Sequence, residues 1–112
     1  MKKSEVHNLV KNNTDNNYFI EITNQFKKSF VLCVERGLNK QLLIDAVKIL
    51  AREGVLPPEY KAHPLKGYKK KKNEVVMECH IMPDWLLIWI QNDNELTLLL
   101  IDTGGHADLF GM

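Results

Sequence analysis

Three apolar runs at residues 75–81, 85–91 and 95–101 constrain the fold of this chain more than any other feature. β-branched, aromatic and other apolar residues dominate them, as in strands, and turn sequences separate them at 83–84 and 92–94. Consecutive strands joined by short turns pair as an antiparallel meander. A chain of 112 residues has room for one domain around one core. The remaining segments therefore have to pack on this sheet.

Two amphipathic helices are predicted before these runs. In the first, four apolar residues recur at helical spacing and form a core-facing stripe: Phe26, Phe30, Cys33 and Val34. The second runs from about residue 39 to residue 53, and Gly54 ends it as a C-cap. With a short strand at 18–22, the order β-α-α-β-β-β indicates an α+β domain. We expect the helical hairpin to pack on one face of a small antiparallel sheet.

Residues 1–17 are polar and rich in asparagine and lysine, so we expect a flexible N-terminal extension followed by one domain over 18–112. No apolar run reaches the ~18 residues of a membrane span, and no signal-peptide pattern follows the start. We therefore expect a cytoplasmic protein without a membrane partner. The two cysteines, Cys33 and Cys79, lack CxxC spacing, which argues against a disulfide framework or a cysteine-rich zinc site.

Three of the four histidines stand in phrases flanked by turn residues: His63, His80 and His106. Histidine exchanges protons near neutral pH. In a meander, the end of one strand, the start of the next and the C-terminal tail can meet at one edge of the sheet. We therefore expect these histidines and Asp84 to lie close together and to perform acid–base chemistry. Strand alternation places His80 on the face opposite to Cys79, so Cys79 is predicted to be a buried thiol and not a nucleophile.

A run of lysines precedes the second histidine phrase, with no acidic residue among them: Lys61, Lys66, Lys69, Lys70, Lys71 and Lys72. The formal net charge is only +1, yet a local cluster of this kind binds phosphates. RNA cleavage needs a base for the ribose 2′-hydroxyl, an acid for the leaving 5′-oxygen and a cation for the transition state. Histidines and lysines supply all three, and an aromatic ring can stack on an unpaired base.

These residues also carry a resemblance. Residues 56–67 (LPPEYKAHPLKG), 78–88 (ECHIMPDWLLI) and 103–110 (TGGHADLF), together with Phe26-Lys27-Lys28 and Arg36-Gly37, resemble the YafQ branch of the RelE-like toxins of bacterial toxin–antitoxin pairs. The resemblance implies a ribosome-dependent endoribonuclease that cuts messenger RNA without a metal or other cofactor and that a cognate antitoxin neutralises. The residues that it implies as catalytic are His63, His80, Asp84, His106 and Phe110. Those expected to contact RNA are Lys61, Lys66, Lys69, Lys70 and Trp85.

Two alternatives stay open on the sequence. The chain is longer than the family pattern between Gly67 and His80, and Asp102 stands where many relatives carry arginine. Together with the low net charge, these departures favour a toxin-like module that binds an antitoxin but cleaves RNA weakly. Three histidines and a carboxylate could instead hold zinc in a metal-dependent hydrolase, although their spacing differs from a helical HExxH pair.

Overall fold

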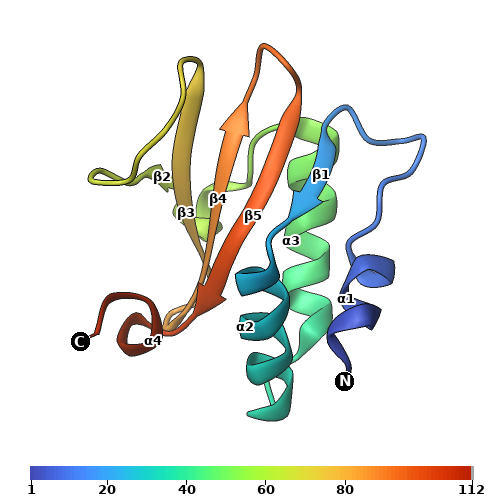
Figure 1. Ribbon diagram of the computed structural model, residues 1–112, viewed down its shortest axis with the longest axis vertical. Helices are drawn as coiled ribbons and strands as arrows, with labels where there is room; N and C mark the ends of the chain where they lie inside the picture. The colour runs from blue at the N-terminus through green and yellow to red at the C-terminus, as the bar shows by residue number, and fades with distance from the viewer. Residues whose placement is uncertain (112) are drawn as a thin grey trace.

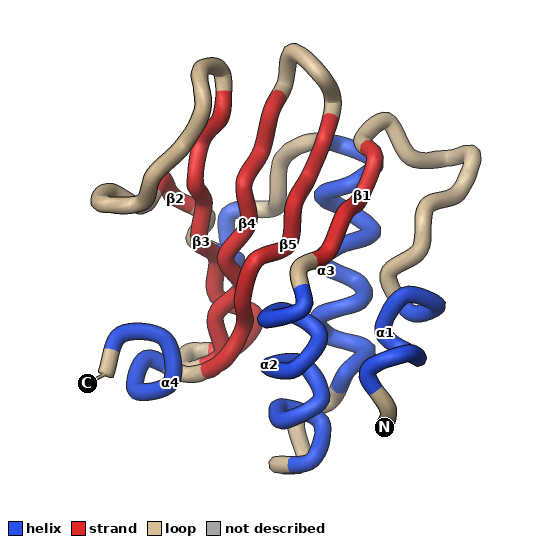
Figure 2. Tube along the Cα trace, viewed as in Figure 1, coloured by secondary structure: helices blue, strands red, loops and turns tan. Residues whose placement is uncertain are grey.

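The computed structural model describes residues 1–111; residue 112, the last of the predicted domain, lies outside the described residues. Its strands are β1 (Phe19–Ile22), β2 (His63–Pro64), β3 (Glu74–Met82), β4 (Trp85–Asn92) and β5 (Thr97–Gly104). Its helices are α1 (Lys3–Leu9), α2 (Asn24–Glu35), α3 (Lys40–Glu53), α4 (His106–Phe110) and the short 3₁₀ helix η1 (Pro58–Tyr60). Helices α2 and α3 lie on one side of the sheet, and α4 lies at the end of β5 (Figures 1 and 2). The predicted α+β class is confirmed.

The sheet has five strands in the order β1-β5-β4-β3-β2. Strands β3 to β5 form the antiparallel meander that the sequence predicts, and the short strand β2, which the sequence does not predict, pairs antiparallel with β3. The sheet as a whole is mixed, because β1 joins β5 in parallel, with Phe19 beside Thr97 and Ile22 beside Leu100. Parallel neighbours need a long crossover connection, and the chain from β1 to β5 includes the helical hairpin. A four-residue strand carries no pattern that predicts this orientation.

Local sequence signals define the ends of the two long helices. The Thr23 hydroxyl accepts a hydrogen bond from the backbone N–H of Phe26 at 3.0 Å and caps α2. The Asn39 side chain caps α3 in the same way through Gln41. Gly54 ends α3 at φ +75°, and a Cβ there would lie 2.6 Å from the Tyr18 hydroxyl. Glycine therefore allows the left-handed backbone conformation, and its lack of a side chain leaves room for the tyrosine.

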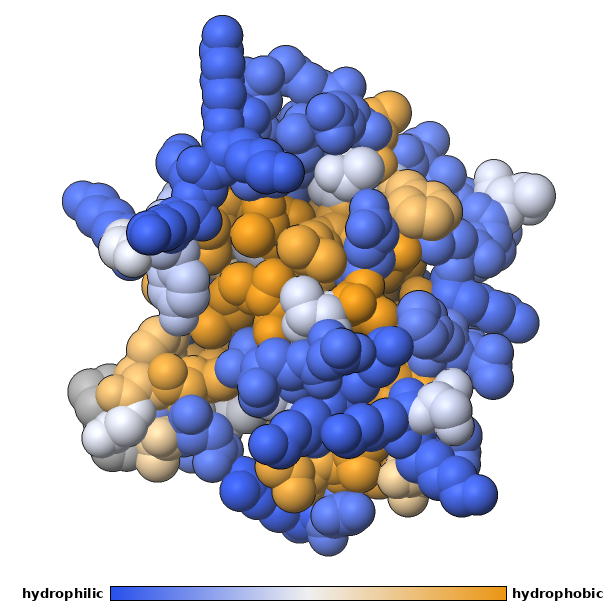
Figure 3. Space-filling model, viewed as in Figure 1, coloured by the Kyte–Doolittle hydropathy of each residue, from blue (hydrophilic) through white to orange (hydrophobic). Residues whose placement is uncertain are grey.

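Alternate residues of β4 point to opposite faces of the sheet. Trp85, Leu87 and Trp89 belong to the core beneath the helices, together with Phe26 and Phe30 of α2. Leu86 and Ile88 lie on the other face, and they too are buried. Figure 3 shows apolar side chains gathered over β3–β5 on the face that no helix covers. The meander thus has apolar residues on both faces.

The N-terminal segment, expected to be a flexible extension, contains the helix α1. Val6 is fully buried and Val10 nearly so, and both belong to the hydrophobic core. The Asn12 amide accepts a hydrogen bond from the backbone N–H of Ile20 at 2.6 Å and donates one to its carbonyl at 3.0 Å. This side chain therefore satisfies backbone groups on the outer edge of β1. Within residues 1–111, no helix is long and apolar enough to cross a bilayer.

Candidate active site

The three histidine phrases converge at one edge of the sheet. His63 lies on β2, His80 near the end of β3, and His106 is the first residue of α4. The ring centroids are 6.5 Å apart for His63 and His80, and 6.0 Å apart for His80 and His106. The ring of Phe110 follows, 6.4 Å from that of His106. The predicted meeting of the three histidines at one edge is therefore confirmed, and the four rings form a line.

Asp84 orients His106. One carboxylate oxygen, Oδ1, accepts hydrogen bonds from the backbone N–H of His106 at 2.9 Å and from its Nδ1 at 2.7 Å. These two bonds lower the pKa of the Asp84 carboxyl, so the group is ionised at neutral pH. Because an ionised carboxylate only accepts, the Nδ1 of His106 carries a proton. The Nε2 atom is then the ring nitrogen that remains available to a substrate.

His63 has a similar partner in Glu78. Its Nδ1 lies 2.9 Å from the carbonyl oxygen of Lys61, and its Nε2 lies 3.2 Å from Oε1 of Glu78. Both partners are acceptors, so the doubly protonated imidazolium is the form that satisfies them together. Glu78 is buried, and its Oε2 finds no hydrogen-bond partner within residues 1–111. The carboxylate therefore stabilises a positive charge on His63.

Sequence reasoning missed Glu78. It stands two residues before His80 and on the same strand face, which is a signal that could have found it. Strand alternation predicts only that this face points away from the core beneath the helices. The two-residue strand β2 pairs with β3 and brings His63 opposite Glu78. A strand this short has no periodicity to predict, so the covering of Glu78 was not foreseen.

The ring of His80 has no hydrogen-bond partner in the described part of the chain. It borders a hollow of about 280 Å³ together with Glu59, Lys61 and Met82. The exposed Lys61 is thus the lysine that the structure places beside a histidine. Of the lysines predicted to contact RNA, Lys66, Lys69 and Lys70 are also exposed. They stand on the connection from β2 to the start of β3, the end of that strand away from His80 (Figure 1).

Trp85 does not reach the surface. Its side chain is fully buried, and its indole N–H donates to the Thr103 hydroxyl at 2.9 Å. That hydroxyl in turn donates to the carbonyl of Leu86 at 2.6 Å. A base cannot stack on a ring without an exposed face, so the expected RNA contact of Trp85 is not available in this structure. Phe110, about one-third exposed, is the aromatic residue of the site that a base can reach.

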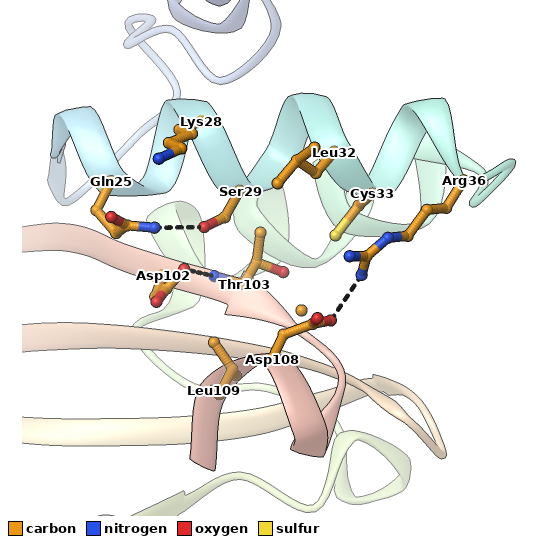
Figure 4. A pocket seen from close by; sticks show the side chains of 11 residues that line it. Gln25, Lys28, Ser29, Leu32, Cys33, Arg36, Asp102, Thr103, Asp108 and Leu109 are labelled. Carbon is orange, nitrogen blue, oxygen red and sulfur yellow. Dashed lines mark hydrogen bonds and ion pairs between the residues drawn. The ribbon is translucent and has the colours of Figure 1, made fainter. Parts of the chain in front are cut away.

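Two further sequence expectations concern Cys79 and Asp102. Cys79 is fully buried, and desolvation raises the pKa of its thiol to about 12. The prediction of an inert buried thiol is therefore confirmed. Asp102 lies toward α2, in a cavity of about 250 Å³ that Lys28 and Ser29 also line (Figure 4). Its carboxylate accepts a hydrogen bond from the backbone N–H of Thr103 at 2.9 Å. This acid is thus directed toward α2 and away from the line of histidines.

The histidines do not form a metal-binding group. Within residues 1–111, no three side chains of histidine, cysteine, aspartate or glutamate stand close enough to hold one metal ion.

Comparison with known proteins places this arrangement in a family. Residues 18–111 match the family described as bacterial toxin of type II toxin–antitoxin system, YafQ. The mRNA interferase toxin YafQ of Escherichia coli strain B is 35% identical over 97 residues, which cover 82% of this chain and 95% of that protein.

Solved structures of YafQ and related toxins show the same similarity. In the crystal structure of the E. coli DinJ–YafQ toxin–antitoxin complex, a chain with 33% identity superposes with a TM-score of 0.73 over 85% of this chain and 99% of its own length. A metal-bound toxin from Helicobacter pylori gives a TM-score of 0.71 at 41% identity, covering 81% of this chain and 97% of that one. The residues that match the family, 18–111, include all three histidines of the site, Asp84 and Phe110. The chain therefore belongs to the YafQ family of toxins of bacterial type II toxin–antitoxin systems.

Proposed function

We propose that this protein is an mRNA interferase: the toxin of a type II toxin–antitoxin pair, which cleaves RNA by acid–base catalysis with histidines. The line of three histidine rings at one sheet edge carries the proposal, because it offers two proton-transfer groups and a cation within reach of one phosphodiester. The family membership supports it, since the E. coli relatives are named mRNA interferase toxins.

His80 is the general base. Among the three histidines it is the one whose ring forms no hydrogen bond within residues 1–111, so a ring nitrogen can accept the proton of the ribose 2′-hydroxyl. The resulting alkoxide attacks the adjacent phosphorus. The attack forms a 2′,3′-cyclic phosphate and breaks the bond from phosphorus to the 5′-oxygen.

His106 is the general acid. Its Nδ1 donates to Asp84, so its Nε2–H in the imidazolium form can protonate the leaving 5′-oxygen. The ionised Asp84 fixes the tautomer and stabilises the imidazolium before the proton leaves. Asp84 is a positioning residue in this scheme, because its carboxylate acts through His106.

His63 and Lys61 stabilise the charge on the phosphorane-like transition state. The Glu78 carboxylate favours the imidazolium form of His63, and Lys61 borders the hollow beside His80. Phe110 stacks on a base next to the cleaved bond. Lys66, Lys69 and Lys70 contact phosphates farther along the strand.

The ribosome presents the messenger RNA, and a cognate antitoxin neutralises the toxin. The structure of a YafQ with the antitoxin DinJ supports such a partner. Because ribosomes and messenger RNA are its targets, the protein acts in the cytoplasm. The scheme uses no cofactor, and no step of it passes through a metal ion.

In vivo cleavage mapping tests the function. The protein is induced from a tight promoter, and primer extension locates breaks in a translated message. We expect codon-phased cuts and growth arrest. His106→Ala should abolish both, while His7→Ala, a change of the exposed histidine on α1, should leave them intact.

The same mapping, together with an assay of purified protein, separates the alternatives. Intact RNA together with a tight antitoxin complex would favour a module that binds the antitoxin without cleaving RNA. Purified protein that loses cleavage in EDTA and regains it with zinc would favour a metal-dependent hydrolase.

A further inference from the structure

The helix that carries His106 and Phe110 is held in place by few contacts. α4 has only five residues, and none of them is buried. A helix this short is not stable by itself in water. Its orientation, and with it the positions of both rings, therefore depends on contacts with the rest of the protein.

Two carboxylates provide polar anchors for α4, one on each side. Asp84 binds the backbone and ring of His106. On the side facing α2, Oδ2 of Asp108 accepts a hydrogen bond from the backbone N–H of Gly105 at 2.9 Å and contacts the Arg36 guanidinium at 2.7 Å (Figure 4). Asp108 thus caps the first turn of its own helix and connects that helix to α2.

The two glycines before α4 allow both carboxylates to approach. A Cβ at Gly104 would lie 3.1 Å from the Cβ of Asp108, and the backbone there has φ +154°. A Cβ at Gly105 would lie 3.0 Å from Oδ2 of Asp84. Any other residue at either position would collide with one of these two carboxylates. The two glycines are therefore needed for the contacts that hold α4.

Side-chain packing does not fill the space between α2 and α4. A cavity of about 250 Å³ separates them, lined by residues that include Cys33, Thr103 and Leu109 (Figure 4). The ion pair between Arg36 and Asp108 spans this gap. It is the one salt bridge between α2 and α4 within residues 1–111.

The backbone of Arg36 is itself well fixed. Arg36 is the C-cap of α2, and its N–H donates to the carbonyl of Leu32 at 3.0 Å. Gly37 follows at φ +91°, and the N–H of Leu38 closes the turn on the carbonyl of Cys33 at 3.1 Å. A cation at a helix C-terminus is also favourable toward the helix dipole. Arg36 therefore offers α4 an anchor on a rigid element.

We propose that Arg36 is a positioning residue for the catalytic site, which acts through Asp108 to hold α4 so that His106 and Phe110 stay aligned with His80. The role of α4 in cleavage rests on the proposed function, whereas the placement of α4 does not. The two parts can therefore be tested separately.

Kinetics with purified toxin, ribosomes and a translated message test the role in cleavage. Both side chains of the pair are partly exposed, so Arg36→Gln should lower kcat by about two- to fivefold. KM should rise by no more than about twofold, because the base stacking of Phe110 on α4 is one of several contacts that bind the substrate. Arg36→Lys should recover part of the loss. The matched control is Arg52→Gln, which breaks a similarly exposed pair with Glu53 on α3 and should leave kcat unchanged.

A double-mutant cycle tests whether Arg36 acts through Asp108. Asp108→Asn keeps an oxygen for the cap and removes the charge. If the two residues act as a pair, the double variant should lose no more activity than either single variant. Independent, multiplying losses would overturn the proposal, and so would an Arg36→Gln defect confined to KM.

NMR of the free protein tests positioning without any assay of activity. Arg36→Gln should shift or broaden the amide signals of His106 and Phe110 and leave those of α3 unchanged. Unchanged signals on α4 would overturn the proposal. If instead the α4 signals respond while the unsubstituted protein cuts no RNA, positioning stands and the proposed function fails.

Discussion

Two histidines of the site have a carboxylate partner, and the two pairs differ in their access to water. The side chain of Glu78, which binds His63, is 7% exposed, whereas that of Asp84, which binds His106, is 76% exposed. A buried carboxylate without a partner costs folding free energy, whereas an exposed one is solvated. We therefore expect the His63 pair to contribute to stability in addition to its proposed part in cleavage. The Asp84 pair acts mainly on the orientation of one ring.

The largest expected effect is on stability, from His63→Ala. The change leaves Glu78 buried and unpaired, so we expect the free energy of unfolding at neutral pH to fall by about 1–3 kcal/mol. Urea denaturation measures the loss. His80→Ala is the matched control, because that ring has no hydrogen bond within residues 1–111. Adding Glu78→Gln to His63→Ala should restore most of the stability. Equal losses for the two histidines would show that the buried carboxylate is not the cause.

The next effect is on catalysis, from Asp84→Ala. Without its carboxylate His106 loses its fixed orientation, and cleavage should fall by about ten- to a hundredfold, part of what a general acid contributes. The melting temperature should change by less than about 3 °C, because the carboxylate is exposed. Single-turnover cleavage and thermal unfolding measure the two quantities. Asp93→Ala, which removes another exposed carboxylate that accepts a hydrogen bond, is the control for activity. A large loss of stability in Asp84→Ala would show that the two carboxylates do not differ in their contribution to stability.

A smaller effect is expected for Glu78→Gln. The amide preserves the shape of the side chain but no longer stabilises the imidazolium of His63, so cleavage should fall by about three- to tenfold. Single-turnover cleavage by the variant beside the unsubstituted protein measures the loss. Unchanged cleavage would contradict a role for the Glu78 carboxylate beside His63.

The two carboxylates also differ in whether the sequence predicts them: Asp84 was expected at the site, and Glu78 was not. Alternation along residues 75–81 separates His80 from Cys79, and the turn at 83–84 places Asp84 near the edge. Glu78 was not recognised because its burial depends on β2, whose pairing with β3 is a tertiary contact. Trp85 was expected to contact RNA because it stands in a phrase with Asp84. One step along a strand reverses the face, and its ring points into the core.

Other elements were missed for related physical reasons. α4 is too short for helical periodicity, and its position depends on contacts with Asp84 and Arg36, which are distant in sequence. Val6 in α1 and Val10 just after it contribute to the core in a segment whose composition is mostly polar. The parallel placement of β1 follows from the route of the connecting chain, which a residue pattern does not specify. In each case contacts distant in sequence decided the local structure, whereas the long helices and the meander follow from local periodicity and turn residues.

The smallest expected effect concerns pH and the anchoring of α4. Hydrogen bonds from His106 lower the pKa of Asp84, and the Arg36 guanidinium and the N–H of Gly105 lower that of Asp108. A carboxyl whose pKa is lower in the folded state stabilises that state fully above its unfolded value of about 3.9 and loses this effect as the pH falls through the folded value. Between about pH 5 and 8 both anchors therefore stay ionised. The protection of the Gly105 and His106 amides against hydrogen exchange, measured by NMR at a series of pH values, should stay unchanged down to about pH 5 in Asp93→Ala as well as in the unsubstituted protein. Loosening of α4 already at about pH 6 would mean that histidine protonation, and not the exposed carboxylates, controls the anchoring of this helix.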